Sequence, residues 1–188
     1  MAVLESIRSF LVPGFHAEPE VIIPAAPCEY SVRALTLDHL QEALRLNIRC
    51  FRNGDNYTKH TFAYLLNEPR TLSYRMVTPL DEMVGFVFVM VNENNAAHLT
   101  TIGVAPEHRR RGIAVRLLEH VEGSLRRRGI GTIMLEVRVS NETAQDLYRQ
   151  AGYWVVQRIG KYYNNGEDFF LMMKALYKFK VSGSTFKV

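Results

Sequence analysis

Three consecutive arginines, Arg109 to Arg111, stand directly before a glycine and a predicted helix, in the stretch EHRRRGIAVRLLEH. The first turn of a helix carries partial positive charge, so a cation there costs about 0.3–1 kcal/mol. A bound anion reverses this effect, because it accepts hydrogen bonds from the first N–H groups of the helix and from the arginines. The stretch therefore predicts a phosphate-binding turn between a strand and a helix.

Small residues at the turn support this interpretation. Gly112 lets the backbone approach a ligand closely, and Ala114 keeps the next turn small enough for a pyrophosphate. The alternative interpretation is a solvated basic run or a nucleic-acid patch. However, the net charge of +4 is only mildly basic. The aromatic residues also do not interleave with the arginines as a base-stacking platform requires, so we expect no nucleic-acid partner.

Hydrophobic periodicity on both sides of the turn predicts one mixed α/β domain. Strands are expected over 30–35, 72–78, 83–91, 98–105, 132–139, 153–163 and 168–176. Helices are expected from Asp38 to about Phe51, from Thr58 to Leu66, from the arginine turn to Gly129, and from Ser140 or Asn141 to Ala151. The third helix joins its flanking strands as a βαβ unit, so these two should be parallel, while hairpins elsewhere make the sheet mixed.

Two helix faces and one turn carry specific expectations. In the first helix, Leu40, Leu44 and Ile48 recur at four-residue spacing and are expected to face the core. The helix after the arginines has a longer apolar face, made by Ile113, Leu117, Leu118, Val121 and Leu125. Between the last two strands, Asn165-Gly166 is the strongest available signal for a hairpin turn.

Proline density separates the start of the chain from the domain. Four of the seven prolines lie in the first 27 residues and exclude a continuous helix or a central strand there. We therefore expect 1–27 to be an extension with a short helix at 2–11. The domain is expected to cover 28–180, followed by a basic tail at 181–188.

Cysteines and histidines limit the chemistry. Cys28 and Cys50 are distant in sequence, and we recognise no signal peptide or membrane span, which indicates free thiols in a cytoplasmic protein without a membrane partner. The six histidines lack metal-ligand spacing, so we expect no metal. His98 and His108 flank the predicted site, and we expect both to be solvated.

The Arg109-x-x-Gly112-x-Ala114 spacing resembles the Q/R-x-x-G-x-G/A signature of the GNAT acetyltransferase superfamily, whose turn binds the pyrophosphate of acetyl-CoA. The resemblance continues through HLTTIGVAPEHRRRGIAVRLLEHVE, IMLEVRVSNETAQDLYRQAGYWVV and KYYNNGEDFFLMM. It is strongest toward the N-terminal protein acetyltransferases of the ribosomal-protein-alanine type and their archaeal relatives, and it covers about residues 30–176. It implies a mostly antiparallel seven-stranded sheet, splayed between its fourth and fifth strands, with helices on both faces and acetyl-CoA in the cleft.

The same resemblance assigns the donor site. It implies that acetyl-CoA contacts the strand backbone at Ile102, Gly103 and Val104, the turn residues Arg109, Arg110, Arg111, Gly112, Ile113 and Ala114, and the side chains of Asn141 and Tyr148. Asn141 belongs to the family's SN motif and would contact the pantetheine arm.

Glu136 and Tyr148 are the candidate catalytic residues. Glu136 interrupts an apolar strand and shares a face with Thr132, Met134 and Arg138, so it is a partly buried base or else a strand-end carboxylate paired with Arg138. Tyr148 lies on the buried face of its helix, where spacing alone favours a core tyrosine. The resemblance implies that Glu136 is the general base and that Tyr148 donates to the departing CoA thiolate.

The resemblance also implies the acceptor. Tyr57, Tyr162 and Tyr163 would hold the first residues of a peptide, and the alternative for them is ordinary surface aromatics. The implied reaction is direct attack of a protein's N-terminal α-amino group on acetyl-CoA in a ternary complex, by a monomer or a homodimer. A small amine or a lysine side chain is the alternative acceptor, because the loop from Phe51 to Thr58 lacks the proline common in this family. A non-catalytic acyl-CoA-binding module is a further alternative.

Overall fold

The computed structural model describes residues 22–51, 56–160 and 166–177. The strands are β1 (Ser31–Ala34), β2 (Thr71–Val77), β3 (Met83–Val91), β4 (Ala97–Val104), β5 (Thr132–Arg138), β6 (Trp154–Ile159) and β7 (Phe169–Ala175). The helices are α2 (Leu40–Cys50), α3 (Lys59–Asn67), α4 (Ile113–Arg127) and α5 (Glu142–Gln150), with short 3-10 turns η1 (Leu37–His39) and η2 (Pro106–His108). The expected helix at 2–11, Asn165 of the hairpin turn and the tail at 181–188 lie outside the described residues.

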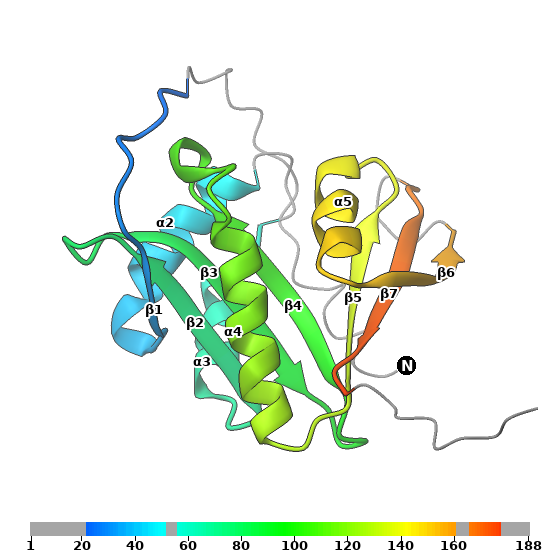
Figure 1. Cartoon of the computed structure of the whole chain (residues 1–188). Coiled ribbons are helices and arrows are strands. Elements are labelled where there is room, and N and C mark those ends of the chain that lie inside the picture. The colour runs from blue at the N-terminus through cyan, green and yellow to red at the C-terminus, as the bar shows by residue number, and fades with distance from the viewer. Residues whose placement is uncertain (1–21, 52–55, 161–165, 178–188) are drawn as a thin grey trace, which may run out of the picture.

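The strands form one mixed sheet in the order β1-β2-β3-β4-β5-β7-β6. Every neighbouring pair is antiparallel except β4 and β5, which are parallel because α4 carries the chain between them. In Figure 1, α4 and α5 lie on one face of the sheet, and α2 and α3 lie on the other. The predicted mixed, mostly antiparallel sheet with helices on both faces is confirmed.

The parallel pair is short, and the sheet splits beyond it. β4 and β5 pair only at Ala97 with Ile133 and at His98 with Met134, and the two strands then diverge (Figure 1). A β-bulge falls at Thr100, because the pairing of β4 with β3 shifts register there. A bulge bends its strand and increases the local twist, which turns β4 away from β5. The expected splay between the fourth and fifth strands is confirmed.

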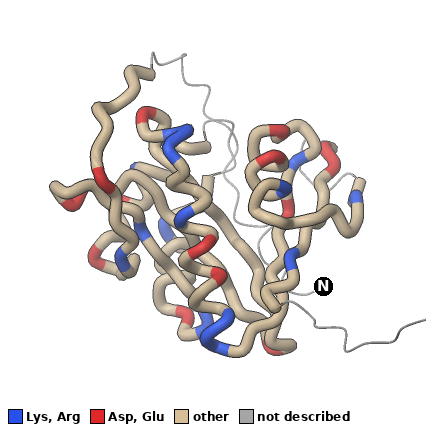
Figure 2. Tube along the Cα trace, in the orientation of Figure 1, with Lys and Arg blue, Asp and Glu red and all other residues tan. Residues whose placement is uncertain are grey.

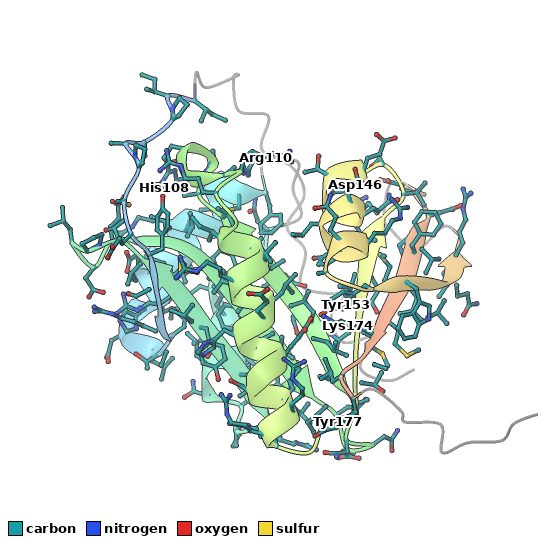
Figure 3. The ribbon with its side chains drawn as sticks, in the orientation of Figure 1. His108, Arg110, Asp146, Tyr153, Lys174 and Tyr177 are labelled. Atoms are coloured by element: carbon teal, nitrogen blue, oxygen red, sulfur yellow. The ribbon has the colours of Figure 1, made fainter. Side chains whose placement is uncertain are left out.

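A charge pair with a buried carboxylate crosses the narrow end of this splay. Glu122 of α4 is 3% exposed, and Lys174 of β7 donates to its carboxylate at 2.6 Å. The ammonium group also lies 5.6 Å from the ring centroid of Tyr153, and Figure 3 shows Lys174 and Tyr153 close together on this side of the molecule. Burial, with Glu122 nearby, raises the pKa of the Tyr153 hydroxyl well above its usual range. The pair ties α4 to the β5–β7 arm.

The core face of α4 is confirmed. That of α2 is confirmed in part, because Leu40 and Leu44 are partly buried and pack against the core, whereas the expectation for Ile48 was wrong. All five predicted apolar residues of α4 are buried. In α2, however, the buried residues are Ala43, Leu46 and Asn47, while Ile48 is 61% exposed. Four residues advance a helix by about 400°, so a strict four-residue spacing drifts around the axis by about 40° per step. Spacings of three and four together keep one face, as they do in α4.

We predict opposite stability effects for two Gly→Ala substitutions. A Cβ at Gly103 would lie 2.8 Å from the Phe86 ring and 3.1 Å from Cys50 Sγ, so Gly103→Ala should destabilise the fold by about 1–3 kcal/mol through overpacking. At Gly123 of α4 the nearest atom is Arg127 Nη1 at 3.5 Å, so Gly123→Ala should stabilise it by roughly 0.5–1 kcal/mol. Denaturant unfolding measures both. Wild-type stability of Gly103→Ala would contradict the close packing of β3 on β4.

Candidate active site

The arginine turn lies at the open end of the splay, because it follows directly on β4. Arg110 and Gly112 both have left-handed backbone conformations, with φ of 62° and 73°. Gly112 is the N-cap of α4, and a Cβ placed on it would meet nothing within 4 Å. The first-turn N–H groups of α4 therefore face an open surface at the helix end with partial positive charge. Ile113 beside it is buried, and Ala114 is half-buried.

The three arginine side chains differ in what they contact. Arg109 donates to the backbone carbonyls of Val104, at 3.2 Å, and Cys50, at 3.3 Å. Arg111 donates to Ala25 O and Ala26 O and to the Tyr30 hydroxyl. Within the described residues, the exposed Arg110 guanidinium has no hydrogen bond or ion pair. Figure 2 shows basic residues at this turn and again at the far end of α4, where cations suit the helix dipole.

Glu136 and His98 meet at the narrow end of the splay. His98 Nε2 lies 2.6 Å from Glu136 Oε2, and the two side chains are 8% and 12% exposed. The buried atoms Glu136 Oε1 and His98 Nδ1 have no hydrogen-bond partner within the described residues. The carboxylate of Glu136 is not paired with Arg138, whose guanidinium instead donates to Glu167 at 2.8 Å. This buried pair therefore has one carboxylate oxygen available for a further hydrogen bond.

The expectation that both histidines are solvated was wrong. His98 is buried because it is the last residue of β4 that pairs with β5. His108 is 4% exposed, since the turn packs it against Tyr30, whose hydroxyl lies 2.9 Å from its Nδ1. Burial lowers the pKa of His108. The crossover through α4 predicts that β4 and β5 are neighbours but not their register, so the sequence could not place His98 opposite Glu136.

Glu167 supports the segment that follows β5. Its carboxylate accepts from the Ser140 backbone N–H at 2.9 Å and from Arg138. Hydrogen bonds from Ser140, together with Arg138, lower the pKa of Glu167 to about 2. The only sequence signal for this residue was its place in the NNGED run, and it was not among the predicted site residues.

Tyr148 and Asn141 come from α5, on the other side of the splay. Tyr148 is 7% exposed, and its ring lies 5.7 Å from that of Tyr153. Asn141 is exposed and caps α5, because its side chain accepts from Ala144 N at 3.1 Å. Asn141 therefore fixes the start of α5, whatever ligand it also contacts.

Of the three acceptor-site tyrosines, the structure describes Tyr57. Its hydroxyl donates to Thr100 O at 3.0 Å, at the β4 bulge, and its backbone carbonyl accepts from Asn47 at 3.3 Å. Tyr57 is thereby attached to the strand that lines the splay. Tyr162 and Tyr163 lie outside the described residues. Among the residues that the structure describes, no group of three or more His, Cys, Asp and Glu side chains could hold a metal ion. No helix in this described part has the length and hydropathy of a membrane span.

Comparison with known proteins identifies the family. Residues 40–153 match the Acetyltransferase (GNAT) family, and this chain belongs to that family of acetyltransferases. It is 28% identical over 160 residues to an N-alpha-acetyltransferase of Saccharolobus solfataricus, covering 79% of this chain and 94% of the relative. It is 36% identical over 97 residues to the [Ribosomal protein bS18]-alanine N-acetyltransferase of Escherichia coli, covering 52% and 64%.

A solved structure of the same type of enzyme has a similar fold. The crystal structure of the ribosomal-protein-S18-alanine N-acetyltransferase from Escherichia coli matches with a TM-score of 0.73 at 27% identity, over 83% of this chain and 99% of that one. The resemblance inferred from the motifs is thus confirmed by family, relatives and fold.

We predict that the two thiols differ sharply in reactivity. Burial raises the pKa of Cys50 to about 11, so only about one molecule in a thousand carries its thiolate at pH 8. Cys28 is exposed. Iodoacetamide should therefore modify Cys28 at least about 100-fold faster in the folded protein, as measured by mass spectrometry of peptides. The rates should converge in denaturant, and equal rates in the folded protein would contradict the burial of Cys50.

Proposed function

We propose that this protein transfers the acetyl group of acetyl-CoA to the N-terminal α-amino group of a protein, by direct attack in a ternary complex. The observation that carries the proposal is the split between β4 and β5. It holds the buried Glu136–His98 pair at its narrow end and opens toward the arginine turn. The relatives named as N-alpha-acetyltransferase and ribosomal-protein-alanine N-acetyltransferase support an N-terminal acceptor.

The donor fits the open end of the split. Its pyrophosphate would accept from the N–H groups that begin α4 at Gly112 and Ile113. Beyond His98, β4 is paired with β3 but not with β5. Its edge from Ile102 to Val104 therefore offers backbone groups to the amides of the pantetheine arm. Such pairing would place the thioester near the narrow end of the split.

The acceptor must lose a proton before it attacks. A free α-amino group has a pKa of about 8, so only about a tenth of it is neutral at pH 7. Glu136 would accept this proton through Oε1, directly or through one water, because that oxygen is buried and without a hydrogen-bond partner among the described residues. His98 would hold the carboxylate in place through Oε2. We assign His98 as a positioning residue in this site.

The leaving group is the CoA thiolate. Tyr148 approaches from α5, opposite the β4 edge, and would donate its hydroxyl proton as negative charge develops on sulfur. Tyr57, attached to the β4 bulge, would line the acceptor side. No cysteine takes part, so no acetyl-enzyme forms.

The acceptor class can be tested directly. Purified protein with acetyl-CoA should acetylate peptides with free N-termini, detected by CoA release and by mass spectrometry of the product. It should not acetylate peptides whose only amine is a lysine side chain, or polyamines. A peptide with an acetylated N-terminus and no lysine is the matched control and should give no product. Turnover of polyamines alone would contradict the proposal and favour a small-molecule acceptor.

We predict that the proposed catalytic residues separate in a pH–rate series. Glu136→Gln should lower kcat by about 10²-fold at pH 7, and high pH should recover part of the loss because solvent then supplies neutral amine. Tyr148→Phe should lower kcat by about tenfold with little change in acetyl-CoA affinity. High pH should not recover that loss, since the missing donor acts on the leaving group.

Variants of His98 complete this series. His98→Gln retains an N–H donor for Glu136, whereas His98→Leu does not. His98→Leu should therefore be slower than His98→Gln, by a few-fold to about tenfold. If Glu136→Gln showed wild-type rates from pH 6 to 9, Glu136 and His98 would have a structural role and no role in proton transfer.

A further inference from the structure

The segment before β1 crosses the arginine turn and is bonded to it. Ala25 N donates to Glu107 O at 3.0 Å. Arg111 Nη1 donates to Ala26 O at 2.9 Å and to the Tyr30 hydroxyl at 2.8 Å, and its Nη2 donates to Ala25 O. Ala25, Ala26 and Tyr30 precede the part of the chain that matches the family, residues 40–153. The family comparison therefore leaves them without a role.

Tyr30 anchors the other end of this segment. Its hydroxyl lies 2.9 Å from His108 Nδ1, its ring packs edge-on against the His108 ring at 5.8 Å, and its carbonyl accepts from Arg116 of α4 at 2.6 Å. Figure 3 shows His108 beside this segment, with Arg110 farther along the same turn. The segment from Ala25 to Tyr30 thus spans the turn, from η2 to the second turn of α4.

The opposite side of the turn is fixed as well. Arg109 donates to Val104 O and Cys50 O, and Arg49 of α2 pairs with the Glu107 carboxylate at 2.7 Å. Two of the three consecutive arginines therefore bond to the protein's own carbonyl groups, one on each side. Arg110 lies between them, exposed and without a hydrogen bond or ion pair among the described residues.

We propose that residues 25–30 form a clamp that fixes the phosphate-binding turn. In this assignment Arg111 is a positioning residue of the clamp, and Arg110 is the arginine that contacts the pyrophosphate of acetyl-CoA. The assignment rests on the proposed function, because it concerns the same donor site. It divides the arginine run into one ligand-binding side chain and two that hold the turn.

The clamp acts on donor binding. The first-turn N–H groups and Arg110 present their donors to phosphate only while the turn keeps its two left-handed residues. A turn that is already ordered loses less conformational freedom when the ligand binds. Loss of the clamp therefore raises the KM for acetyl-CoA and leaves the chemical step, at the narrow end of the split, unchanged.

Calorimetry with CoA on three single and two double variants tests the assignment. Arg110→Ala and Arg111→Ala should each weaken binding by about tenfold, and Tyr30→Phe by about threefold. Arg111→Ala combined with Tyr30→Phe should bind no more weakly than Arg111→Ala alone, because both act through one clamp. Arg110→Ala combined with Tyr30→Phe should show the product of the two losses. Steady-state kinetics should show a raised KM for acetyl-CoA with unchanged kcat and unchanged KM for the acceptor.

Controls separate the possible failures. Tyr64→Phe is the matched substitution at an exposed tyrosine of α3 and should bind CoA as wild type does. Gly112→Glu places a carboxylate at the phosphate position and should abolish binding. If Arg111→Ala does not fold, Arg111→Lys should give an intermediate affinity, because it keeps the charge but has one donor nitrogen instead of three.

Three results would overturn the clamp while leaving the proposed function standing. The first is that Tyr30→Phe binds CoA with wild-type affinity. The second is that Arg111→Ala combined with Tyr30→Phe loses as much affinity as the product of the two single losses. The third is that Arg111→Ala or Tyr30→Phe lowers kcat and leaves the KM for acetyl-CoA unchanged. An absence of CoA binding by the wild-type protein would instead contradict the proposed function, and the clamp with it.

Discussion

The departure of β4 from β5 after two paired residues is the constraint on which the rest of the structure depends. Backbone N–H and C=O groups on a buried strand edge need partners, and the split leaves such groups where β5 would otherwise have paired. The bulge at Thr100 turns β4 away from β5, and α4 connects the end of β4 to the start of β5. The split therefore determines where the Glu136–His98 pair and the arginine turn lie, the pair at its narrow end and the turn at its open end.

Much of this arrangement follows from local pattern. The α4 face was predictable because its apolar residues recur at spacings of three and four. The parallel pair was predictable because a helix joins its two strands. The alternation along β5 was predictable as well, because Glu136 shares its face with Thr132, Met134 and Arg138, while Ile133, Leu135 and Val137 on the other face are buried. The split itself came from the family resemblance, since periodicity carries no information on where paired strands separate.

Contacts between distant parts of the chain were not predictable in the same way. His98 and Glu136 are 38 residues apart, and their meeting depends on the register of β4 against β5. The arginine partners are a similar case, because a basic run before a helix indicates an anion but does not distinguish phosphate from carbonyl oxygens. The exposure of Ile48 shows that a pattern with one constant interval can mark a helix without marking its buried side.

The charge pair at the narrow end has a consequence for how the polypeptide reaches this fold during synthesis. Glu122 is buried on α4, and its ammonium partner, Lys174, is 52 residues farther along the chain. A buried carboxylate needs a nearby cation. Arg126 of the same helix lies 3.7 Å from Glu122, but the partner at 2.6 Å comes from β7, so the closer pair forms only after β7 has left the ribosome. α4 is therefore translated before the segment that completes its ion pair, and that segment is the last strand in the described part of the chain.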